Sequence, residues 1–350
     1  MRKERSLHTL YIRADGNNEI GSGHIMRTLA IAHTFRDMGG DCVFITADHM
    51  AGELINKYKF DYICLNTKWN DLINEISYLN QIIKAKGCEH ILFDTYFASP
   101  EYFASLSSLK YKSYIDDFQN NVFPVDLIIH YQINTNFEFY YNSYMLTRTR
   151  FCLGEQYAPL RQEFSKCEPF EVRDHVKRIC ITTGGTDYHN ISNKILVGFQ
   201  QKGWLPLYDI QVIIGKYYTE PERLICQFSQ YKNITFLKEP SSMSEVFCSC
   251  DLIISAAGST LYELCACGVP TIAFLIADNQ EGVYDMEDQQ LLVVGADFRN
   301  EKQGQLKQLM DNFELFVNDV EKRRFYSKNM QLRVDGKGAY RIAKTIMNHE

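Results

Sequence analysis

The chain has 350 residues, of which 45% are apolar and 23% are charged, so it can bury one large core or two ordinary ones. Its formal net charge of −6 argues against the broad basic surface that nucleic-acid binding usually needs. No apolar run reaches the roughly 18 residues of a membrane-spanning helix, and no apolar segment follows the basic N-terminus. We therefore expect a cytoplasmic protein with no membrane span and no nucleic-acid partner.

The first half of the chain alternates short β-rich runs with helical patterns. Strands are predicted at residues 9–13, 42–45, 62–65 and 90–93. A helix is predicted from about His24 to Met38, and it ends at a pair of glycines that is typical of a helix C-terminus. This βαβ rhythm predicts a mostly parallel sheet.

The middle of the chain changes character. Between about residues 131 and 150 the pattern turns aromatic and polar, and Pro159 and Pro169 then flank a polar stretch. A new strand pattern starts near Lys177, so we place the link between two domains before it. The aromatic residues 137–141 could line a ligand site or pack a hairpin, and the pattern favours packing.

The second half repeats the rhythm, with strands predicted at residues 179–181, 210–214, 234–236, 252–254 and 271–274. The sequence thus predicts an α/β protein with two Rossmann-like, doubly wound domains that face a central cleft. Their predicted bounds are 1–160 and 175–332, and residues 333–350 contain a last helix. Ligands of such sheets bind at the carboxyl ends of the strands, so the loops found there are the candidate sites.

The first candidate loop follows the first strand and leads directly into a helix. Gly21 and Gly23 allow the backbone to approach a ligand, and His24 stands at the helix start. Met26 takes the place of the third glycine of a dinucleotide fingerprint, and no P-loop motif occurs. The positive end of the helix dipole favours a neutral imidazole that can accept a proton, although His24 could equally be a helix cap or a surface histidine.

A second candidate loop follows the strand at residues 252–254. Gly258 precedes Ser259 and Thr260, which open a predicted helix whose unpaired N–H groups can bind phosphate without a lysine. Ser259 or Thr260 is the expected cap of this helix. Glu263 lies near the same end, where it could either accept hydrogen bonds from a ribose or form a capping box.

Two further loops offer polar groups at the same predicted sheet edge. Gly184 and Gly185 form a turn that suits an anion, after the strand at residues 179–181. Asn279 and Gln280 follow the strand at residues 271–274, and their amides could hydrogen-bond sugar hydroxyls or orient water. Three polar loops at one edge favour a binding site over a purely structural role.

The sequence gives little sign of a metal or cofactor. It lacks a D-x-D triplet, and we interpret the acidic groups at 116–117 and 285–288 as loop or surface residues. The eleven cysteines are an odd number and favour reduced thiols. The pairs Cys248/Cys250 and Cys265/Cys267 have C-x-C spacing without a nearby histidine, so we interpret them as small buried apolar residues and predict no metal site and no cofactor.

Several motifs resemble, in the same order, those of the PseG family of UDP-sugar hydrolases in pseudaminic acid biosynthesis and their spore-coat polysaccharide relatives. The most specific match is the block from Gly21 to Arg27, Gly-Ser-Gly-His-Ile-Met-Arg. The other matches are Arg13-Ala14-Asp15, Asp94-Thr95-Tyr96, Asp116-Asp117 and residues 153–161, 184–187, 258–264, 279–280 and 335–339. Ala257 departs from the family, because a second glycine often stands at that position.

The resemblance implies a GT-B architecture like that of MurG, with a last helix that packs back on the first domain. It implies that the N-terminal domain binds the sugar and the C-terminal domain binds UDP. His24 then matches the proposed catalytic base, Tyr96 and Asn279 match polar groups near the sugar and the attacking water, and Glu263 matches the ribose-binding carboxylate. The other candidate substrate-binding residues are Arg13, Asp15, Gly21, Gly23, Arg27, Gly184, Gly185, Gly258, Ser259, Thr260 and Gln280.

The expected reaction is metal-independent, inverting hydrolysis of a UDP-linked diacetamido-trideoxyhexose to UDP and the free sugar. One alternative is a GT-B glycosyltransferase that passes the sugar to a sugar or lipid acceptor, because the fold cannot separate the two reactions. Another is a sugar-nucleotide binding protein without catalysis. The expected partner is a small-molecule UDP-sugar, and the oligomeric state stays open, a monomer included.

Overall fold

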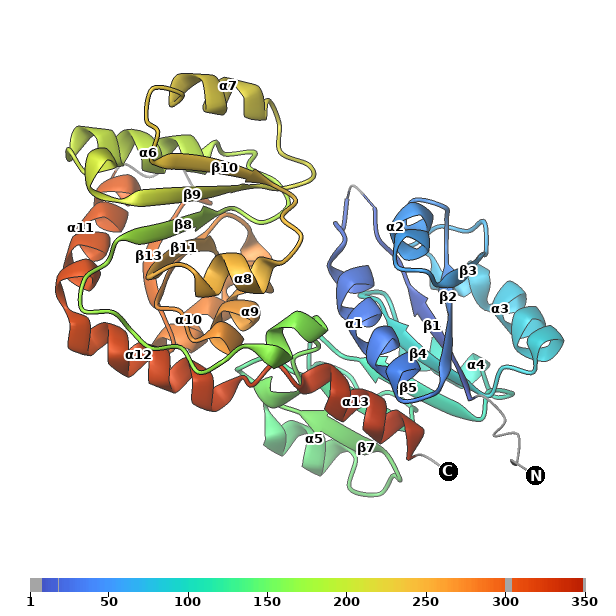
Figure 1. The fold of residues 1–350 in the computed structure, drawn as a ribbon. Coiled ribbons are helices and arrows are strands. Elements are labelled where there is room, and N and C mark those ends of the chain that lie inside the picture. The colour runs from blue at the N-terminus through green and yellow to red at the C-terminus, as the bar shows by residue number, and fades with distance from the viewer. Residues whose placement is uncertain (1–7, 18, 300–303, 349–350) are drawn as a thin grey trace, which may run out of the picture. The chain divides into compact units, whose positions relative to one another are not determined.

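The computed structural model describes residues 8–17, 19–299 and 304–348, which form two compact units (Figure 1). The first unit takes the described residues up to Gln162 and those from Gly336 onward, and the second runs from Glu163 to Asp335. The chain therefore returns to its first unit with its last helix. Among the described residues, no helix combines the length and the apolar character that a membrane span requires.

The first unit contains a seven-stranded parallel sheet with the strand order β3-β2-β1-β4-β5-β6-β7. Its strands are β1 (Thr9–Ala14), β2 (Asp41–Thr46), β3 (Asp61–Cys64), β4 (His90–Asp94), β5 (Tyr111–Ile115), β6 (Leu127–His130) and β7 (Arg150–Leu153). The carboxyl ends of parallel strands meet at one edge. The strand order reverses between β1 and β4, which is where ligands bind in doubly wound sheets.

Helices cover this sheet. They are α1 (Gly23–Asp37), α2 (Gly52–Lys57), α3 (Leu72–Lys86), α4 (Pro100–Ser105), α5 (Phe137–Ser143), the short η1 (Glu155–Tyr157) and α13 (Gly338–Met347). The last helix, α13, packs against α1. Its approach requires Gly338, because a Cβ there would lie 2.1 Å from the carbonyl oxygen of Ala158.

The second unit contains a six-stranded parallel sheet with the order β10-β9-β8-β11-β12-β13. Its strands are β8 (Arg178–Thr182), β9 (Asp209–Ile214), β10 (Ile234–Lys238), β11 (Leu252–Ala256), β12 (Thr271–Leu275) and β13 (Val293–Asp297). β11 and β12 are buried along their whole length, which is typical of parallel strands covered on both faces. Here the strand order reverses between β8 and β11.

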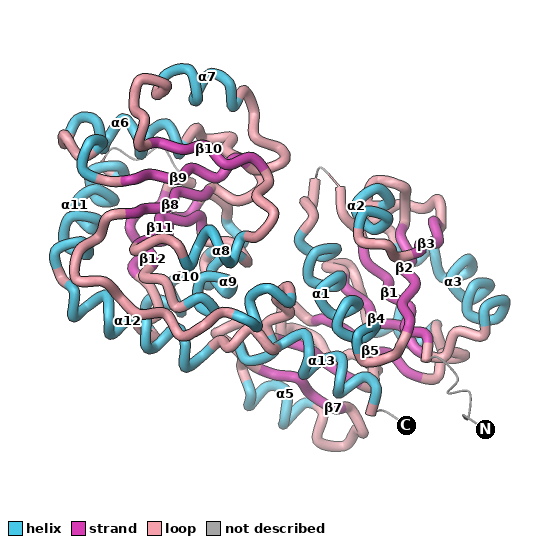
Figure 2. Tube along the Cα trace, viewed as in Figure 1, coloured by secondary structure: helices cyan, strands magenta, loops and turns pink. Residues whose placement is uncertain are grey.

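The helices of the second unit lie on both faces of its sheet (Figures 1 and 2). They are η2 (Gln162–Lys166), α6 (Ile191–Gln201), η3 (Leu205–Leu207), α7 (Pro221–Gln227), α8 (Met243–Cys248), α9 (Thr260–Cys267), η4 (Asp278–Gln280), α10 (Gly282–Asp288), α11 (Gln305–Asn318) and α12 (Val320–Arg333). α6 packs with α11, whereas α9 packs with α8 and α12.

The predicted pair of doubly wound α/β sheets is confirmed, and each predicted strand agrees with a strand of the structure to within two residues. Four strands were not predicted, namely β5, β6, β7 and β13. The hairpin suggested for residues 137–141 is wrong, because this segment begins α5. The packing role holds for Tyr140, which is fully buried and donates a 2.7 Å hydrogen bond to Asp116.

Candidate active site

His24 and Asp94 meet where the order of the first sheet reverses. α1 follows β1 and places His24 in its first turn, and Asp94 is the last residue of β4. Nδ1 of His24 lies 2.6 Å from Oδ1 of Asp94, and both side chains are buried. A carboxylate can only accept, so in the neutral ring Nδ1 carries the proton and Nε2 keeps its lone pair. This pair is thus arranged like an oriented general base.

Arg27 holds this pair in place from the next turn of α1. Its guanidinium donates to Oδ2 of Asp94 at 2.7 Å, to Oδ2 of Asp117 at 2.6 Å and to the hydroxyl of Tyr131 at 2.7 Å. Burial alone would raise the pKa of Asp94, but the charges of Arg27 and His24 and their hydrogen bonds outweigh it and lower the pKa to about 2. Asp94 is therefore ionised at neutral pH.

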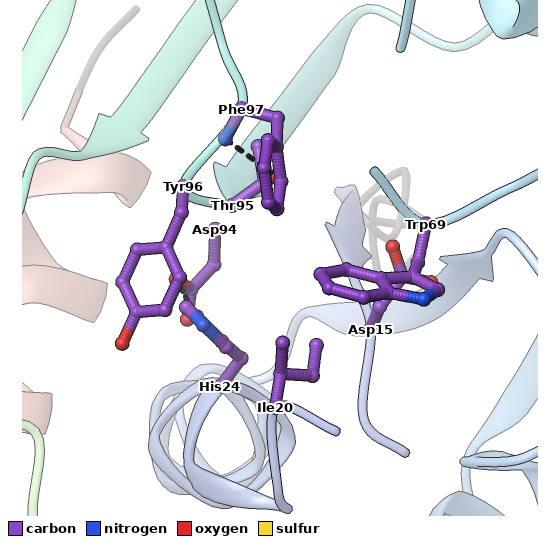
Figure 3. Close-up of a pocket in the computed structure, with 8 residues that line it drawn as sticks. All are labelled: Asp15, Ile20, His24, Trp69, Asp94, Thr95, Tyr96 and Phe97. Atoms are coloured by element: carbon purple, nitrogen blue, oxygen red, sulfur yellow. Dashed lines mark hydrogen bonds and ion pairs between the residues drawn. The ribbon is translucent and has the colours of Figure 1, made fainter. Parts of the chain in front are cut away.

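A small pocket opens beside His24. It is lined by Asp15, Ile20, His24, Trp69, Asp94, Thr95, Tyr96 and Phe97, and Figure 3 shows the imidazole between Asp94 and Tyr96. The rings of His24 and Tyr96 meet edge to face with 4.4 Å between their centroids. Burial, mainly, raises the pKa of Tyr96 to about 12, so its hydroxyl remains a donor at neutral pH. Trp69 and Phe97, also in edge-to-face contact, add apolar surface.

The structure places Arg13 away from the ligand position predicted for it. Its side chain is fully buried, and the guanidinium donates to Glu75 at 2.7 Å and to Asp15 at 2.6 Å. The other oxygen of Asp15 accepts from the backbone N–H of Ala47 at 2.7 Å. Arg13 therefore orients Asp15, which lines the cavity, and does not reach the cavity itself. Arg27 was also predicted to bind the substrate, but its N–H donors are largely engaged by the carboxylates around His24.

The glycines of the first loop have different roles. Gly21 has a φ of +70°, a conformation that disfavours other residues. Gly23 starts α1 and has open space where a Cβ would lie, so no contact requires it. Sequence reasoning overlooked Gly16, where a Cβ would lie only 2.8 Å from the side chain of Ile25.

In the second unit, the loops after β8, β11 and β12 lie at one edge of the sheet because these strands are neighbours and parallel. Gly184 has a φ of +80°, and Gly185 accepts a 2.9 Å hydrogen bond from the N–H of Tyr217. Gly215, which was not predicted, lets the β9 loop approach, because a Cβ there would lie 2.3 Å from the carbonyl oxygen of Gly184.

Two helix N-termini at this edge differ in their caps. Asp187 accepts from the N–H groups of Ile191 and Ser192 at 2.6 and 2.9 Å, so the start of α6 is already occupied by a carboxylate. α9 begins at Thr260 as predicted, but Ser259 makes no side-chain cap bond, which corrects the expected capping role. The start of α9 therefore carries no side-chain cap, whereas the N–H groups of Leu261 and Tyr262 donate to the carbonyl oxygens of Gly258 and Ser259.

The remaining predicted residues also lie at this edge. Glu263 is half-buried in the first turn of α9, and Asn279 belongs to η4 after β12. Oε1 of Gln280 accepts from the backbone of Ile276 at 2.8 Å, so this side chain stabilises its own loop. Asn279 lies in the second unit, whereas the other two predicted catalytic residues, His24 and Tyr96, lie in the first.

Several site residues escaped the sequence analysis. Asp94 and Asp117 were known only as parts of motifs, and Trp69 and Phe97 were not singled out. The acidic pair 116–117 lies in the loop after β5, as one of the two expected placements has it, but not on the surface, because Asp116 is 1% exposed and the side chain of Asp117 is 10% exposed. A usable signal was present, since Asp94 and Asp116 each end or follow an apolar strand.

The described residues contain two groups with the spacing of metal ligands. In the first, formed by His24, Asp94 and Asp117, Arg27 donates to both carboxylates and already provides the positive charge. The second group is formed by the thiols of Cys167, Cys248 and Cys267. All eleven cysteines of the chain are free thiols.

Residues 178–346 match the model of the glycosyltransferase family 28 C-terminal domain. Among solved structures, MurG of Acinetobacter baumannii has a TM-score of 0.66 at 12% identity and covers 97% of this chain and 99% of its own. This likeness shows that the chain has a GT-B fold. The UDP-GlcNAc 2-epimerase of Neisseria meningitidis, solved with UDP-GlcNAc, has a TM-score of 0.62 at 12% identity and covers 98% of this chain and 100% of its own.

One curated protein is similar in sequence. The uncharacterized protein MJ1062 of Methanocaldococcus jannaschii is 25% identical over 302 residues, which covers 78% of this chain and 57% of that protein. The chain thus spans little more than half the length of this relative.

Proposed function

We propose that this chain is a UDP-sugar hydrolase in which His24 activates the attacking water. The observation that carries the proposal is the buried contact of 2.6 Å between Nδ1 of His24 and Asp94, at a cavity where the strand order reverses. Asp94 fixes the tautomer and stabilises the imidazolium that forms. The motifs of the chain, beginning with the block from Gly21 to Arg27, occur in the same order as in the PseG family.

In the proposed reaction, Nε2 of His24 takes a proton from water while the water oxygen attacks the anomeric carbon. The bond between that carbon and the phosphate oxygen breaks with inversion, giving the free sugar and UDP. UDP leaves as an anion, so no acid is needed on its side if fixed dipoles stabilise its charge. No step requires a metal ion.

The uncapped start of α9 supports a UDP site in the second unit. Its first turn carries Thr260 and Glu263, which we assign to the pyrophosphate and the ribose. The turn at Gly184 exposes backbone at the same sheet edge. Thr183, directly after β8, has a buried hydroxyl without a hydrogen-bond partner, which a bound nucleotide could satisfy. UDP-GlcNAc in the epimerase structure is consistent with a nucleotide-sugar ligand on this fold.

The side chains that line the pocket beside His24 suit contact with a sugar that carries apolar substituents. Trp69 and Phe97 offer a surface on which the methyl groups of a 6-deoxy, acetamido-bearing hexose can pack. Asp15 and Tyr96 offer an acceptor and a donor for hydroxyl or amide groups. The family resemblance narrows this class to a UDP-linked diacetamido-trideoxyhexose.

A glycosyltransferase is the second candidate, because the match of residues 178–346 is to a glycosyltransferase domain. The same His24 would then deprotonate an acceptor hydroxyl, and the donor would stay intact without an acceptor. An epimerase would return a UDP-linked product and release no free sugar.

The test is incubation of the purified protein with UDP-2,4-diacetamido-2,4,6-trideoxy-altrose, with EDTA and without an acceptor. We expect UDP and the free sugar to form in equal amounts. Anion-exchange chromatography measures the UDP, and NMR measures the sugar. NMR at early times should show the inverted anomer. UDP release that depends on an added acceptor would replace the hydrolase with a transferase, and a new UDP-sugar would indicate an epimerase.

A further inference from the structure

Three thiols from distant parts of the chain converge inside the second unit. Cys167 follows η2, Cys248 is the last residue of α8 and Cys267 is the last residue of α9. Their sulfur atoms all lie within 4.8 Å of one another, and those of Cys167 and Cys267 are 3.7 Å apart. The cluster is remote in sequence from the proposed catalytic residue His24 and belongs to the other unit.

We propose that Cys167, Cys248 and Cys267 bind a thiophilic divalent cation of the Zn²⁺ class. Zn²⁺ binds thiolate at about 2.3 Å in a tetrahedron, so two of its sulfur ligands lie about 3.8 Å apart. The distance of 3.7 Å between Cys167 and Cys267 matches that edge and is far longer than a disulfide bond of about 2 Å.

The elements around the cluster hold the three thiols together independently of any cation. Phe164 of η2 is buried and stacks on Phe247 of α8 with 6.4 Å between ring centroids. Oε2 of Glu163 accepts a 2.9 Å hydrogen bond from Ser242, the N-cap of α8. Because α8 and α9 also pack together, the ligands are arranged before a cation arrives.

The exposure of the thiols agrees with this assignment. Cys167 and Cys248 are half-buried and Cys267 is buried, which leaves a route for the cation. Within the described residues no fourth side chain of the metal-binding types joins the group, so water or another external ligand completes the tetrahedron.

The C-x-C pairs explain why the sequence hid this site. Each pair contributes one ligand only, since Cys250 and Cys265 are fully buried outside the group. Cys250 contacts Gln211 instead, with 3.5 Å between Sγ and Oε1. The third ligand, Cys167, lies 81 residues before Cys248, so no local spacing motif reveals it.

Such a cation would stabilise the second unit while its fourth position stays open to an external ligand. It would connect the chain segment that enters the second unit to the ends of α8 and α9, and α9 carries the proposed UDP site at its other end. The proposal does not depend on the hydrolase activity, because its test measures cation binding and stability.

The experiment uses the full chain, reduced and treated with EDTA, then freed of both reagents under nitrogen. Zn²⁺ is added and bound metal per chain is measured by mass spectrometry of the element. Co²⁺, added in parallel, reports thiolate ligation through its charge-transfer absorption. We expect one Zn²⁺ per chain and a rise in Tm of roughly 5–10 °C at concentrations about 100-fold above Kd.

Two variants make the outcome specific. Cys248→Ser removes a half-buried ligand and should abolish the charge-transfer band and the rise in Tm, whereas Cys226→Ser at an exposed thiol of α7 should retain both. Zn²⁺ should also protect Cys167 and Cys248, but not Cys226, from alkylation, which can be measured without a stability readout.

Three results would overturn the proposal. The first is the absence of Zn²⁺ uptake by the reduced protein, and the second is equal uptake by Cys248→Ser. The third is a Cys167–Cys267 disulfide in the untreated protein that, once reduced, leaves thiols without affinity for Zn²⁺. That result would assign the cluster to thiol oxidation.

Discussion

The first sheet reverses its strand order between β1 and β4 and the second between β8 and β11, yet the loops at these two places differ in chemistry. In the first unit, His24, Asp94, Arg27 and Asp117 form a connected network of buried charged and polar side chains. In the second, glycine turns and the uncapped start of α9 present mainly backbone. A proton acceptor needs side chains held in one orientation, whereas an anion can be held by backbone N–H groups.

The largest expected effect tests the catalytic half of this comparison. His24→Ala should lower kcat by about 10²- to 10⁴-fold, the usual contribution of a general base. Binding of UDP, measured by calorimetry, should stay within a factor of two or so of the wild type, because the proposed nucleotide site lies in the other unit.

His33→Ala is the matched control for this variant. His33 is a half-buried histidine on the same helix, α1, and forms no part of the cavity. The His33→Ala variant should retain full turnover. Unchanged turnover in His24→Ala would remove His24 from the mechanism and leave the nucleotide site as a separate question.

Asp94→Asn and Asp117→Asn separate orientation of the base from stability. Both remove a carboxylate from Arg27, so each should lower the free energy of unfolding, by about 3 kcal/mol for the fully buried Asp94 and less for Asp117. In Asp94→Asn the new amide can donate to Nδ1 of His24, which then must accept, so the ring proton moves to Nε2. The amide of Asp117→Asn does not contact His24. Asp94→Asn should therefore lower kcat by about 10²-fold, and Asp117→Asn far less.

The two outcomes are read from kcat at saturating substrate and from urea unfolding. Equal kcat values in the two variants would mean that Asp94 acts only through the fold. Acid unfolding adds a further check, since the lowered pKa of Asp94 contributes stability that is present above about pH 4 and is lost as the pH falls toward 2.

The first unit also shows where sequence reasoning ends. The position of His24 at a helix start could be predicted because its loop, its glycines and its helix are local in sequence. The contact with Asp94 could not, because the pairing of β1 with β4 brings Asp94 to His24, which lies 70 residues away along the chain. Arg13 was misplaced for the same reason, since its burial depends on Glu75 of α3, 62 residues away.

The strands and loops of the second unit were easier to predict. The apolar runs of β8, β11 and β12 are short, continuous and followed at once by glycine or polar residues. β5 was missed because Tyr111, Lys112 and Ser113 interrupt its apolar character, although the strand lies inside the sheet. Backbone sites follow from such patterns, whereas side-chain networks require the tertiary contacts.

Glu263→Gln tests the binding half of the comparison with a smaller effect. If the carboxylate accepts from a ribose, its loss should raise KM by about tenfold or more and leave kcat unchanged, because a hydrogen bond to a charged group is worth about 1.5–3 kcal/mol. If Glu263 only caps α9, Tm should fall and KM should not change. Glu245→Gln, in the first turn of α8, is the control at an exposed carboxylate.

The smallest expected effect concerns a buried histidine next to the charged network of the first unit. His130 ends β6, its Nδ1 donates to the carbonyl oxygen of Asp116 at 2.6 Å, and its buried Nε2 has no hydrogen-bond partner. Burial lowers the pKa of His130, so the folded protein keeps this ring neutral. Below about pH 6.5, His130 binds a proton in the unfolded chain but stays neutral in the folded protein. The free energy of unfolding therefore falls as the pH falls.

His130→Asn removes this titration and retains a donor for the carbonyl oxygen of Asp116. The wild type should lose more unfolding free energy between pH 7 and pH 5.5 than this variant, by about 1 kcal/mol. One proton can contribute at most 1.36 kcal/mol for each pH unit. Urea unfolding at the two pH values measures it, and His175→Asn, at an exposed histidine of the second unit, should leave the loss unchanged. If both variants lose the same unfolding free energy between the two pH values, the acid sensitivity does not arise from the buried ring of His130. The contrast between a charged first unit and a backbone-based second unit would then not extend to stability.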